Sequence, residues 1–187
     1  MSQYFMKNPT QDLIEEHGGI MLMLKIMEKV AAKLKNDQVV EKDHLRKIAE
    51  FLSNFADKCH HGKEEGILFP TLLATLSNTK IINELLGEHQ TGRDYIRGIV
   101  ESLESYQPGN SHAYHIAINM LGYAALLTDH IRKENTLLFP IADKELSAQQ
   151  KASIENRFEN LERDVIGPGK HEEYHGWLSN LEAIYLK

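Results

Sequence analysis

The chain has 187 residues, 42% hydrophobic and 26% charged, so it is long enough to fold as one globular domain with a buried core. Its formal net charge of −6 argues against a nucleic-acid-binding surface, which would need clustered Lys and Arg. The one cysteine, Cys59, excludes an internal disulfide and predicts a reducing, cytoplasmic location. We find no signal peptide, and no apolar run approaches the roughly 18 residues that a membrane span needs.

The first half of the chain contains two long amphipathic segments, and strand-like alternation is missing throughout. The first helix is expected to begin at Asn8 and Pro9, a cap residue followed by proline, and to fade near residue 36. The second starts around Glu41 and runs towards Leu68, and Pro70 marks its end or a break.

Two further helices are expected in the second half. After a short apolar turn at residues 71–76, Ser77 and Asn78 offer a cap for a third helix, which stops at the Gln-Pro-Gly of residues 107–109. A fourth begins near Asn110 and ends before Pro140. Four such segments joined by short connections predict an all-α, antiparallel up-and-down four-helix bundle over residues 1–145.

Residues 146–187 are expected to form additional C-terminal helices packed on this bundle, within one domain overall. A polar helix covers about residues 147–165, and the Gly-Pro-Gly of residues 167–169 separates it from a last helix that reaches Lys187. The same segment is also suited to a dimer contact, so a monomer and a homodimer both stay open.

An internal repeat at an offset of seventy residues is the most informative feature of the sequence. Residues 60–70, HHGKEEGILFP, align without gaps with residues 130–140, HIRKENTLLFP, and share His, Lys, Glu, Leu, Phe and Pro. A His and a Glu four residues apart lie one turn apart on one helix face, so both can reach one metal cluster. The two pairs are His60 with Glu64 and His130 with Glu134.

The alignment also separates these residues from their neighbours. His60 and Glu64 match the second copy, whereas His61 and Glu65 lie roughly 100° around the helix. We therefore predict that His61 and Glu65 lie off the site.

A shorter repeat places Glu-His at residues 16–17 and 88–89. His17 and His89 lie within the apolar stripes of their helices, and His130 continues the stripe of the fourth helix, so four helices each point a histidine inward. Carboxylates in a bundle core are unfavourable unless they are paired, hydrogen-bonded or bound to metal. This nitrogen and oxygen set suits iron, with manganese, zinc or copper possible from ligand type alone.

The number of ligands leaves room for a small molecule. If two irons are bridged by both carboxylates and by one oxo or hydroxo group, each iron has two imidazoles, two carboxylate oxygens and the bridge. About one position per six-coordinate iron then stays open for dioxygen, nitric oxide or peroxide.

The order His, His-x-x-x-Glu, His, His-x-x-x-Glu, with Leu-Phe-Pro closing the second and fourth helices, resembles the hemerythrin-like HHE cation-binding family. The resemblance covers about residues 8–144. It implies a carboxylate-bridged pair of iron ions in which Glu64 and Glu134 bridge. The implied ligands are His17, His60, Glu64, His89, His130 and Glu134.

The chain differs from the oxygen-carrying hemerythrins of invertebrates in two ways. Leu85 and Arg93 stand where those proteins have a second histidine on the third helix, and the last carboxylate is a Glu in a four-residue spacing instead of an Asp in a five-residue spacing. Its four-His, two-Glu set is closer to bacterial di-iron proteins that repair iron–sulfur clusters. Those usually carry an extra N-terminal domain with a cysteine pair, which this sequence does not contain.

Several other readings concern single residues. A ferritin-like di-iron bundle would need Glu-x-x-His on two helices, and the order found here excludes it. His171 and His175 share one helical face and are compatible with a second metal site, with a lid ligand to the first site, or with solvated positions or positions packed against the bundle. Tyr123 and Arg93 are compatible with a core or pocket position, or with a contact to a ligand side chain. His44, His112 and His115 are expected at the surface or at helix ends. Cys59 is expected to be a small buried side chain.

The sequence supports two main functions and identifies no catalytic residue. The first is a non-haem di-iron protein that binds or senses a small diatomic or peroxide ligand. The second is a di-iron redox enzyme or iron donor in stress defence or iron–sulfur cluster repair. Simple iron storage or a structural metal is the third. We expect no nucleic-acid or membrane partner, and no protein partner is identified.

Overall fold

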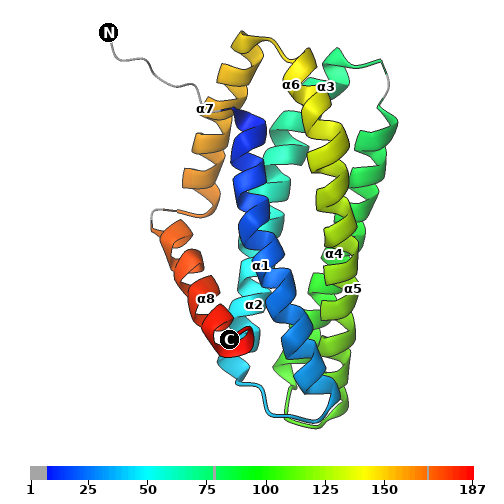
Figure 1. The fold of residues 1–187 in the computed structure, drawn as a ribbon, viewed down its shortest axis with the longest axis vertical. Helices are drawn as coiled ribbons and strands as arrows, with labels where there is room; N and C mark the ends of the chain where they lie inside the picture. Colours follow the sequence, from blue (N-terminus) through cyan, green and yellow to red (C-terminus); the bar gives the residue numbers. More distant parts are fainter. Residues whose placement is uncertain (1–7, 78, 168) are drawn as a thin grey trace.

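The first bundle helix begins and ends where the sequence predicts. The computed structural model describes residues 8–77, 79–167 and 169–187 (Figure 1). Helix α1 (Pro9–Lys35) follows Asn8 and carries proline in its first turn, where the missing N–H would have no partner inside the helix. Its buried face includes Leu13, Ile20 and Met27, and it runs the length of the bundle.

The second bundle helix changes its winding along its length. It consists of α2 (Lys42–Glu50), η1 (Phe51–His61), η2 (Glu64–Leu68) and α3 (Phe69–Thr75). Segments η1 and η2 are π-helical: the N–H of Gly62 donates to the carbonyl of Asp57, and that of Phe69 to the carbonyl of Glu64, each five residues back. The break expected at Pro70 is a return to α-helix, with Pro70 in the first turn of α3.

The third and fourth bundle helices pair closely. Helix α4 (Lys80–Glu104) begins after Thr79, and the cap predicted at Asn78 lies outside the described residues. The fourth consists of α5 (Ser111–Lys133), η3 (Glu134–Leu138) and α6 (Phe139–Glu145). The predicted end before Pro140 is wrong, because Pro140 stands in the first turn of α6, where proline is tolerated. The offset of seventy residues therefore holds in the structure too, with η2 and α3 matching η3 and α6.

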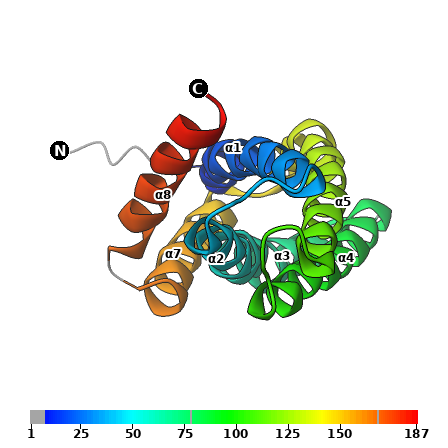
Figure 2. The ribbon, with the colours of Figure 1, turned by 90° about the horizontal axis from the view of Figure 1, so that it is seen from below.

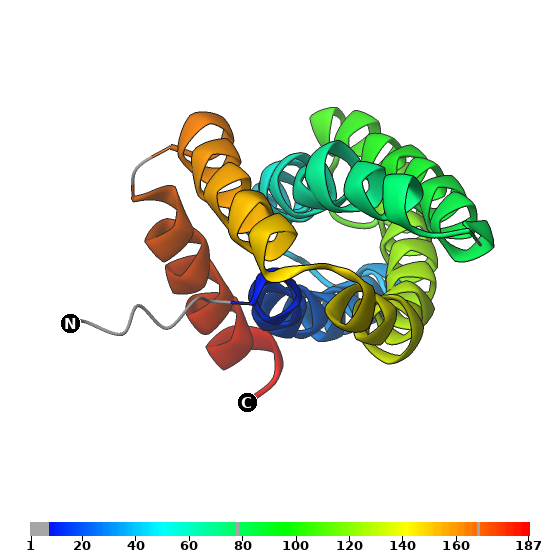
Figure 3. The ribbon, with the colours of Figure 1, turned by 90° about the horizontal axis from the view of Figure 1, so that it is seen from above.

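The described helices form the all-α, antiparallel up-and-down bundle that the sequence predicts. Successive helices run in opposite directions and are joined at alternate ends (Figure 1). Viewed along the axis, α1 lies beside α5, α5 beside α4, and α4 beside α2 (Figures 2 and 3). None of the helices in the described ranges has the length and apolar character of a membrane span.

Two apolar cores lie one after the other along the bundle axis. The larger core includes Ile20, Leu52 and Ile96, and the smaller core includes Leu13 and Leu85. On α1 and on α4 the change from one core to the other comes at His17 and His89. The predicted site residues therefore lie at the boundary between two apolar layers.

The two C-terminal helices pack on the face of the bundle formed by α1 and the second bundle helix (Figures 2 and 3). Helix α7 (Ala148–Val165) begins with a capping box between Ser147 and Gln150, and it contacts α1, η1 and η2. Helix α8 (Lys170–Tyr185) packs against α1 and contributes Tyr174 and Leu178 to the larger core.

Removing one methylene from the contact between α7 and the smaller core tests this packing. Ile154 is 1% exposed, so Ile154→Val is expected to lower the free energy of unfolding by about 0.5–1.5 kcal/mol. Urea denaturation measures the change. Val165→Ala on the same helix is the control, because that side chain is 45% exposed and its truncation is expected to have almost no effect. Equal effects of the two variants would contradict this packing.

Candidate metal centre

A buried histidine–glutamate cluster lies at the boundary between the two cores. All four bundle helices contribute, and none of the side chains is more than 2% exposed. The cluster consists of His17, His60, His61, Glu64, His89, His130 and Glu134.

Two sets of side chains in this cluster could each hold a metal ion, with ligand atoms within 4.8 Å of one another. The structure brings together all six residues that the sequence predicts, and Glu64 belongs to both sets. The first set is His17, His60, Glu64 and Glu134. The second set is His61, Glu64, His89 and His130.

Glu64 faces both sets with one carboxylate oxygen each. Its Oε1 lies 3.7 Å from Nε2 of His60, in the first set. Its Oε2 lies 3.5 Å from Nε2 of His89, in the second set. This is the orientation that a carboxylate needs to bridge two metal ions.

Glu134, the counterpart of Glu64 in the second copy of the repeat, is oriented in the same way. Its Oε2 lies 3.2 Å from Nε2 of His17, and its Oε1 lies 3.2 Å from Nε2 of His130. Both carboxylates are therefore suited to bridge, and the two sets are two halves of one site.

Acceptors outside the cluster fix the rings of His60 and His130. Nδ1 of His60 lies 2.8 Å from Oε2 of Glu16, and Nδ1 of His130 lies 2.8 Å from Oε2 of Glu88. An ionised carboxylate only accepts, so each Nδ1 carries the hydrogen and donates it. Nε2 then keeps the lone pair that binds metal, with the ring held in orientation.

His17 and His89 are held in the same way. Nδ1 of His17 donates to Oδ1 of Asn135 at 2.8 Å, and Nδ1 of His89 donates to Oε1 of Glu65 at 2.7 Å. Asn135 and Glu65 occupy matching places in the two copies of the repeat. Glu65 is in neither set, as predicted, but it orients a member of the second set.

The other residues shared by the two copies also have matching contacts. Lys63 donates to Glu16, the acceptor for His60, and Lys133 donates to Glu88, the acceptor for His130. The ring of Phe69 stacks on His89 with centroids 5.8 Å apart. The ring of Phe139 stacks on His17 with centroids 5.6 Å apart. The repeated sequence thus builds the cluster and its surroundings twice.

The prediction that His61 lies off the site is wrong. The side chain is 1% exposed, and its ring stacks on His89 with centroids 3.9 Å apart. The prediction assumed the rotation per residue of an α-helix, whereas residues 51–61 are π-helical. With more residues in each turn, successive side chains are rotated by less than the α-helical angle, and His60, His61 and Glu64 are all buried at the cluster.

Arg93 ties together two carboxylates behind the second set. It donates to Oε1 of Glu65 at 2.6 Å and to Oδ1 of Asp57 at 2.8 Å. Glu65 holds His89, and Asp57 lies 3.4 Å from Nδ1 of His61. Arg93 therefore acts on the second set indirectly, through Glu65 and Asp57, which lie against two of its histidines.

The cluster lacks cationic side chains for its own two carboxylates. In the described part of the chain, the ion pairs of Glu64 and Glu134 are with histidines only. Burial and the charge of Glu134 raise the pKa of Glu64 well above its ordinary value. Burial also opposes ionisation of Glu134, but His130 and His17 hold its pKa well below the ordinary value.

Most of the cluster histidines are neutral at pH 7, the form that binds metal. Burial lowers the pKa of His60 to about 4, and it also lowers the pKa values of His61 and His89. Burial acts in the same direction on His130, but Glu134 and Glu88 raise its pKa overall. Nε2 of His130 lies 3.0 Å from Nε2 of His89, so the two lone pairs face each other unless one nitrogen carries a proton or both bind a metal ion.

Unsatisfied polar atoms test whether the cluster fits metal. Buried atoms without a hydrogen-bond partner are unfavourable and call for a bound water or ion. Here they include Nε2 of His17 and of His61 and both oxygens of Glu64 and Glu134. Imidazole nitrogens and carboxylate oxygens that converge from four helices fit a transition-metal cation, iron among them.

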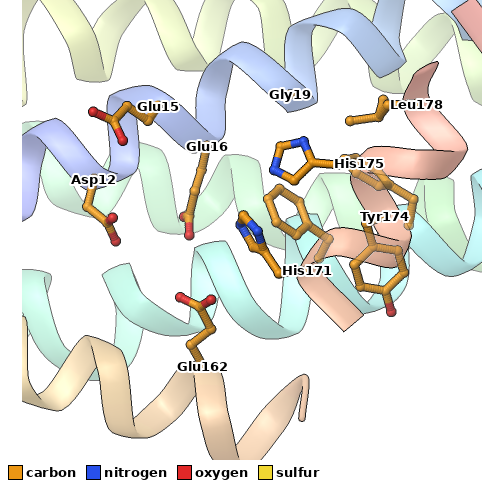
Figure 4. A pocket seen from close by; sticks show the side chains of 11 residues that line it. Asp12, Glu15, Glu16, Gly19, Glu162, His171, Tyr174, His175 and Leu178 are labelled. Carbon is orange, nitrogen blue, oxygen red and sulfur yellow. The ribbon is translucent and has the colours of Figure 1, made fainter. Parts of the chain in front are cut away.

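A separate cavity lies on the outer side of α1, between α1, α7 and α8. It has a volume of about 270 Å³, and Glu16, Glu162 and His171 point into it from these three helices (Figure 4). His171 and His175 both line this cavity, and neither belongs to the sets of described residues that could hold metal. Glu16 lies between the cavity and His60.

The remaining residues considered from the sequence have other surroundings. Cys59 is buried, and burial with the charge of Glu16 raises the pKa of its thiol to about 12, which suits a packed residue. Tyr123 is buried in the larger core. His44 is half-buried and forms a 2.8 Å hydrogen bond with the hydroxyl of Tyr185. His112 is half-buried and His115 is exposed on α5.

Comparisons with known proteins agree with this site. The Hemerythrin HHE cation binding domain matches residues 8–142, which include the whole cluster. Uncharacterized proteins of Mycobacterium tuberculosis (Rv1995) and Mycobacterium bovis (Mb2018) are each 26% identical over 161 residues, or 84% of this chain. The chain spans 62% of the length of these relatives. No solved structure matches. With four bundle helices, a buried histidine–glutamate cluster and a match over most of its length, the chain belongs to the hemerythrin HHE cation-binding family.

Proposed function

We propose that the protein binds two iron ions in the histidine–glutamate cluster and uses them to bind or sense a small diatomic or peroxide ligand. The observation that carries this proposal is the orientation of Glu64 and Glu134, each with one oxygen towards each set. A pair of irons held in this way would supply an open coordination position and exchangeable electrons.

The surroundings of the cluster favour a small ligand. The cluster lies between two apolar cores, with Phe69 and Phe139 stacked on its histidines. Outer acceptors hold the imidazoles in place, so the ligand atoms are oriented before metal binds. A buried site of this kind excludes bulk water and large substrates, and it suits dioxygen, nitric oxide or peroxide.

Metal content per chain tests the proposal first. Protein produced with iron is expected to contain about two irons per chain, and the visible spectrum of its reduced form is expected to change with oxygen and to recover when oxygen is removed. His60→Ala is expected to abolish this change, whereas His115→Ala, at an exposed histidine, is the matched control. Absence of metal, or one zinc ion that survives His60→Ala, would refute the proposal.

The spectra also separate binding from the second candidate function. Irreversible oxidation, followed by turnover with an electron donor or by iron transfer to an apo iron–sulfur protein, would favour redox or repair activity over reversible ligand binding.

A further inference from the structure

We infer that His61 is a fifth histidine ligand, which gives the second metal position three imidazoles and the first position two. This inference rests on the proposed pair of metal ions and adds a residue outside the predicted four-His, two-Glu set.

The geometry of His61 matches that of the other four histidines. Its ligand atom lies within 4.8 Å of those of Glu64, His89 and His130. Nδ1 points to an outer carboxylate, Asp57, at 3.4 Å, and Nε2 is buried without a hydrogen-bond partner. Every cluster histidine thus turns Nδ1 outward, and a ligand on Nε2 would complete His61 as it completes the others.

Packing does not account for this nitrogen. Stacking on His89 at 3.9 Å needs a flat ring, which phenylalanine would supply without a buried unpaired nitrogen. A metal ion bound by the second set would satisfy Nε2 of His61. It would also explain why a polar ring occupies a position that is 1% exposed.

The repeat isolates His61 as the difference between the two halves. Its counterpart seventy residues later is Ile131, a buried apolar residue. The bridging glutamates, the outer acceptors, the lysines and the stacked phenylalanines all have counterparts in both copies. The number of imidazoles is therefore unequal only because of this substitution.

Anaerobic titration with Fe(II), and with Co(II) as a spectroscopic probe, tests the inference on wild-type protein and on His61→Phe. Phenylalanine keeps the flat ring and removes Nε2. We expect wild type to bind two ions and the variant to bind one ion normally and the other at least about 10–100-fold more weakly. His112→Phe, a half-buried histidine outside the cluster, is the matched control.

A second variant keeps the test decisive if His61→Phe fails to fold. His61→Glu restores a ligand atom of a different kind, so it is expected to bind two Co(II) ions with an altered visible spectrum. Two ions bound by His61→Phe with wild-type affinity would overturn the role of His61 and leave the proposed function intact. Fewer than two ions bound by wild type would overturn the metal pair itself, and this inference with it.

Discussion

Replacing Glu64 by Gln is expected to abolish tight binding of both metal ions and, at the same time, to stabilise the metal-free protein. Glu64 offers one oxygen to each set, so removing its charge weakens both positions together. In the metal-free protein the same carboxyl is fully buried, and among the described residues its ion pairs are with His60 and His89. A neutral amide of the same shape removes the cost of ionising this buried group.

The gain in stability is expected to depend on pH. Burial and the charge of Glu134 raise the pKa of Glu64 above its ordinary value of 4.5, so the unfolded chain releases a proton that the folded chain retains. Folding is therefore disfavoured increasingly as the pH rises above about 4.5, until the folded-state pKa is reached. The difference between Glu64→Gln and wild type should be small at pH 4 and at least about 1 kcal/mol at pH 7.

Thermal unfolding in the presence of a chelator measures this effect, and at pH 7 we expect the variant to melt about 2–4 °C or more above wild type. Metal affinity is measured separately by competition titration. Glu65→Gln is the neighbouring control, because Glu65 holds His89 from outside the two sets, so its loss should weaken metal binding without abolishing it. Wild-type affinity in Glu64→Gln would contradict the bridging role, and a lower melting temperature at pH 7 would contradict the charge argument.

The sequence predicts the architecture well because helical periodicity and caps are local. Proline after Asn8 predicts the start of α1, and Asn110 caps α5 by accepting from the N–H of Ala113. The repeat at an offset of seventy residues predicts which His and Glu residues the structure brings together. Pro140 misleads, because proline interrupts a helix in its interior but fits the first turn of α6.

Two features of the site depend on information that is not local. The position of His61 follows from π-helical winding, which no residue type in the segment signals. Lys63 is shared by both copies of the repeat, but its partner Glu16 lies on another helix, 47 residues earlier. A pairwise contact of this kind becomes visible only when the helices are assembled.

Lys63→Met is the second variant with a large expected effect, a loss of about 3–5 kcal/mol in the free energy of unfolding. The ammonium group is 0% exposed and joins three helices, with Asp12 at 3.0 Å, Glu162 at 3.2 Å and Glu16 in contact. Burial acts to raise the pKa of Glu16, but the hydrogen bond from His60 and then the charge and hydrogen bond of Lys63 lower it to about 2. Without Lys63, a buried carboxylate loses its main cationic partner.

Urea denaturation of the metal-free protein measures this loss, and two further variants identify its cause. Lys133→Met changes the counterpart in the repeat, which is 19% exposed, and is expected to lower the free energy of unfolding by only about 1 kcal/mol. The double variant Glu16→Gln with Lys63→Met removes both charges while the amide oxygen still accepts from His60, so it should recover much of the stability. A double variant as unstable as Lys63→Met would show that the contact of the Lys63 ammonium with the ring of Phe158, and not its pairing with Glu16, is responsible.

The same substitution also connects stability to metal binding. Lys63 orients Glu16, and Glu16 orients the ring of His60, so loss of the lysine should weaken the first metal position by about 10–100-fold and leave the second position nearly unchanged. Lys133→Met should act on the second position instead, through Glu88 and His130. Titration of both variants with Co(II) therefore gives opposite patterns if the two halves of the repeat each control one metal. Identical patterns would mean that the lysines act on the fold as a whole and not on the ligand in their own half.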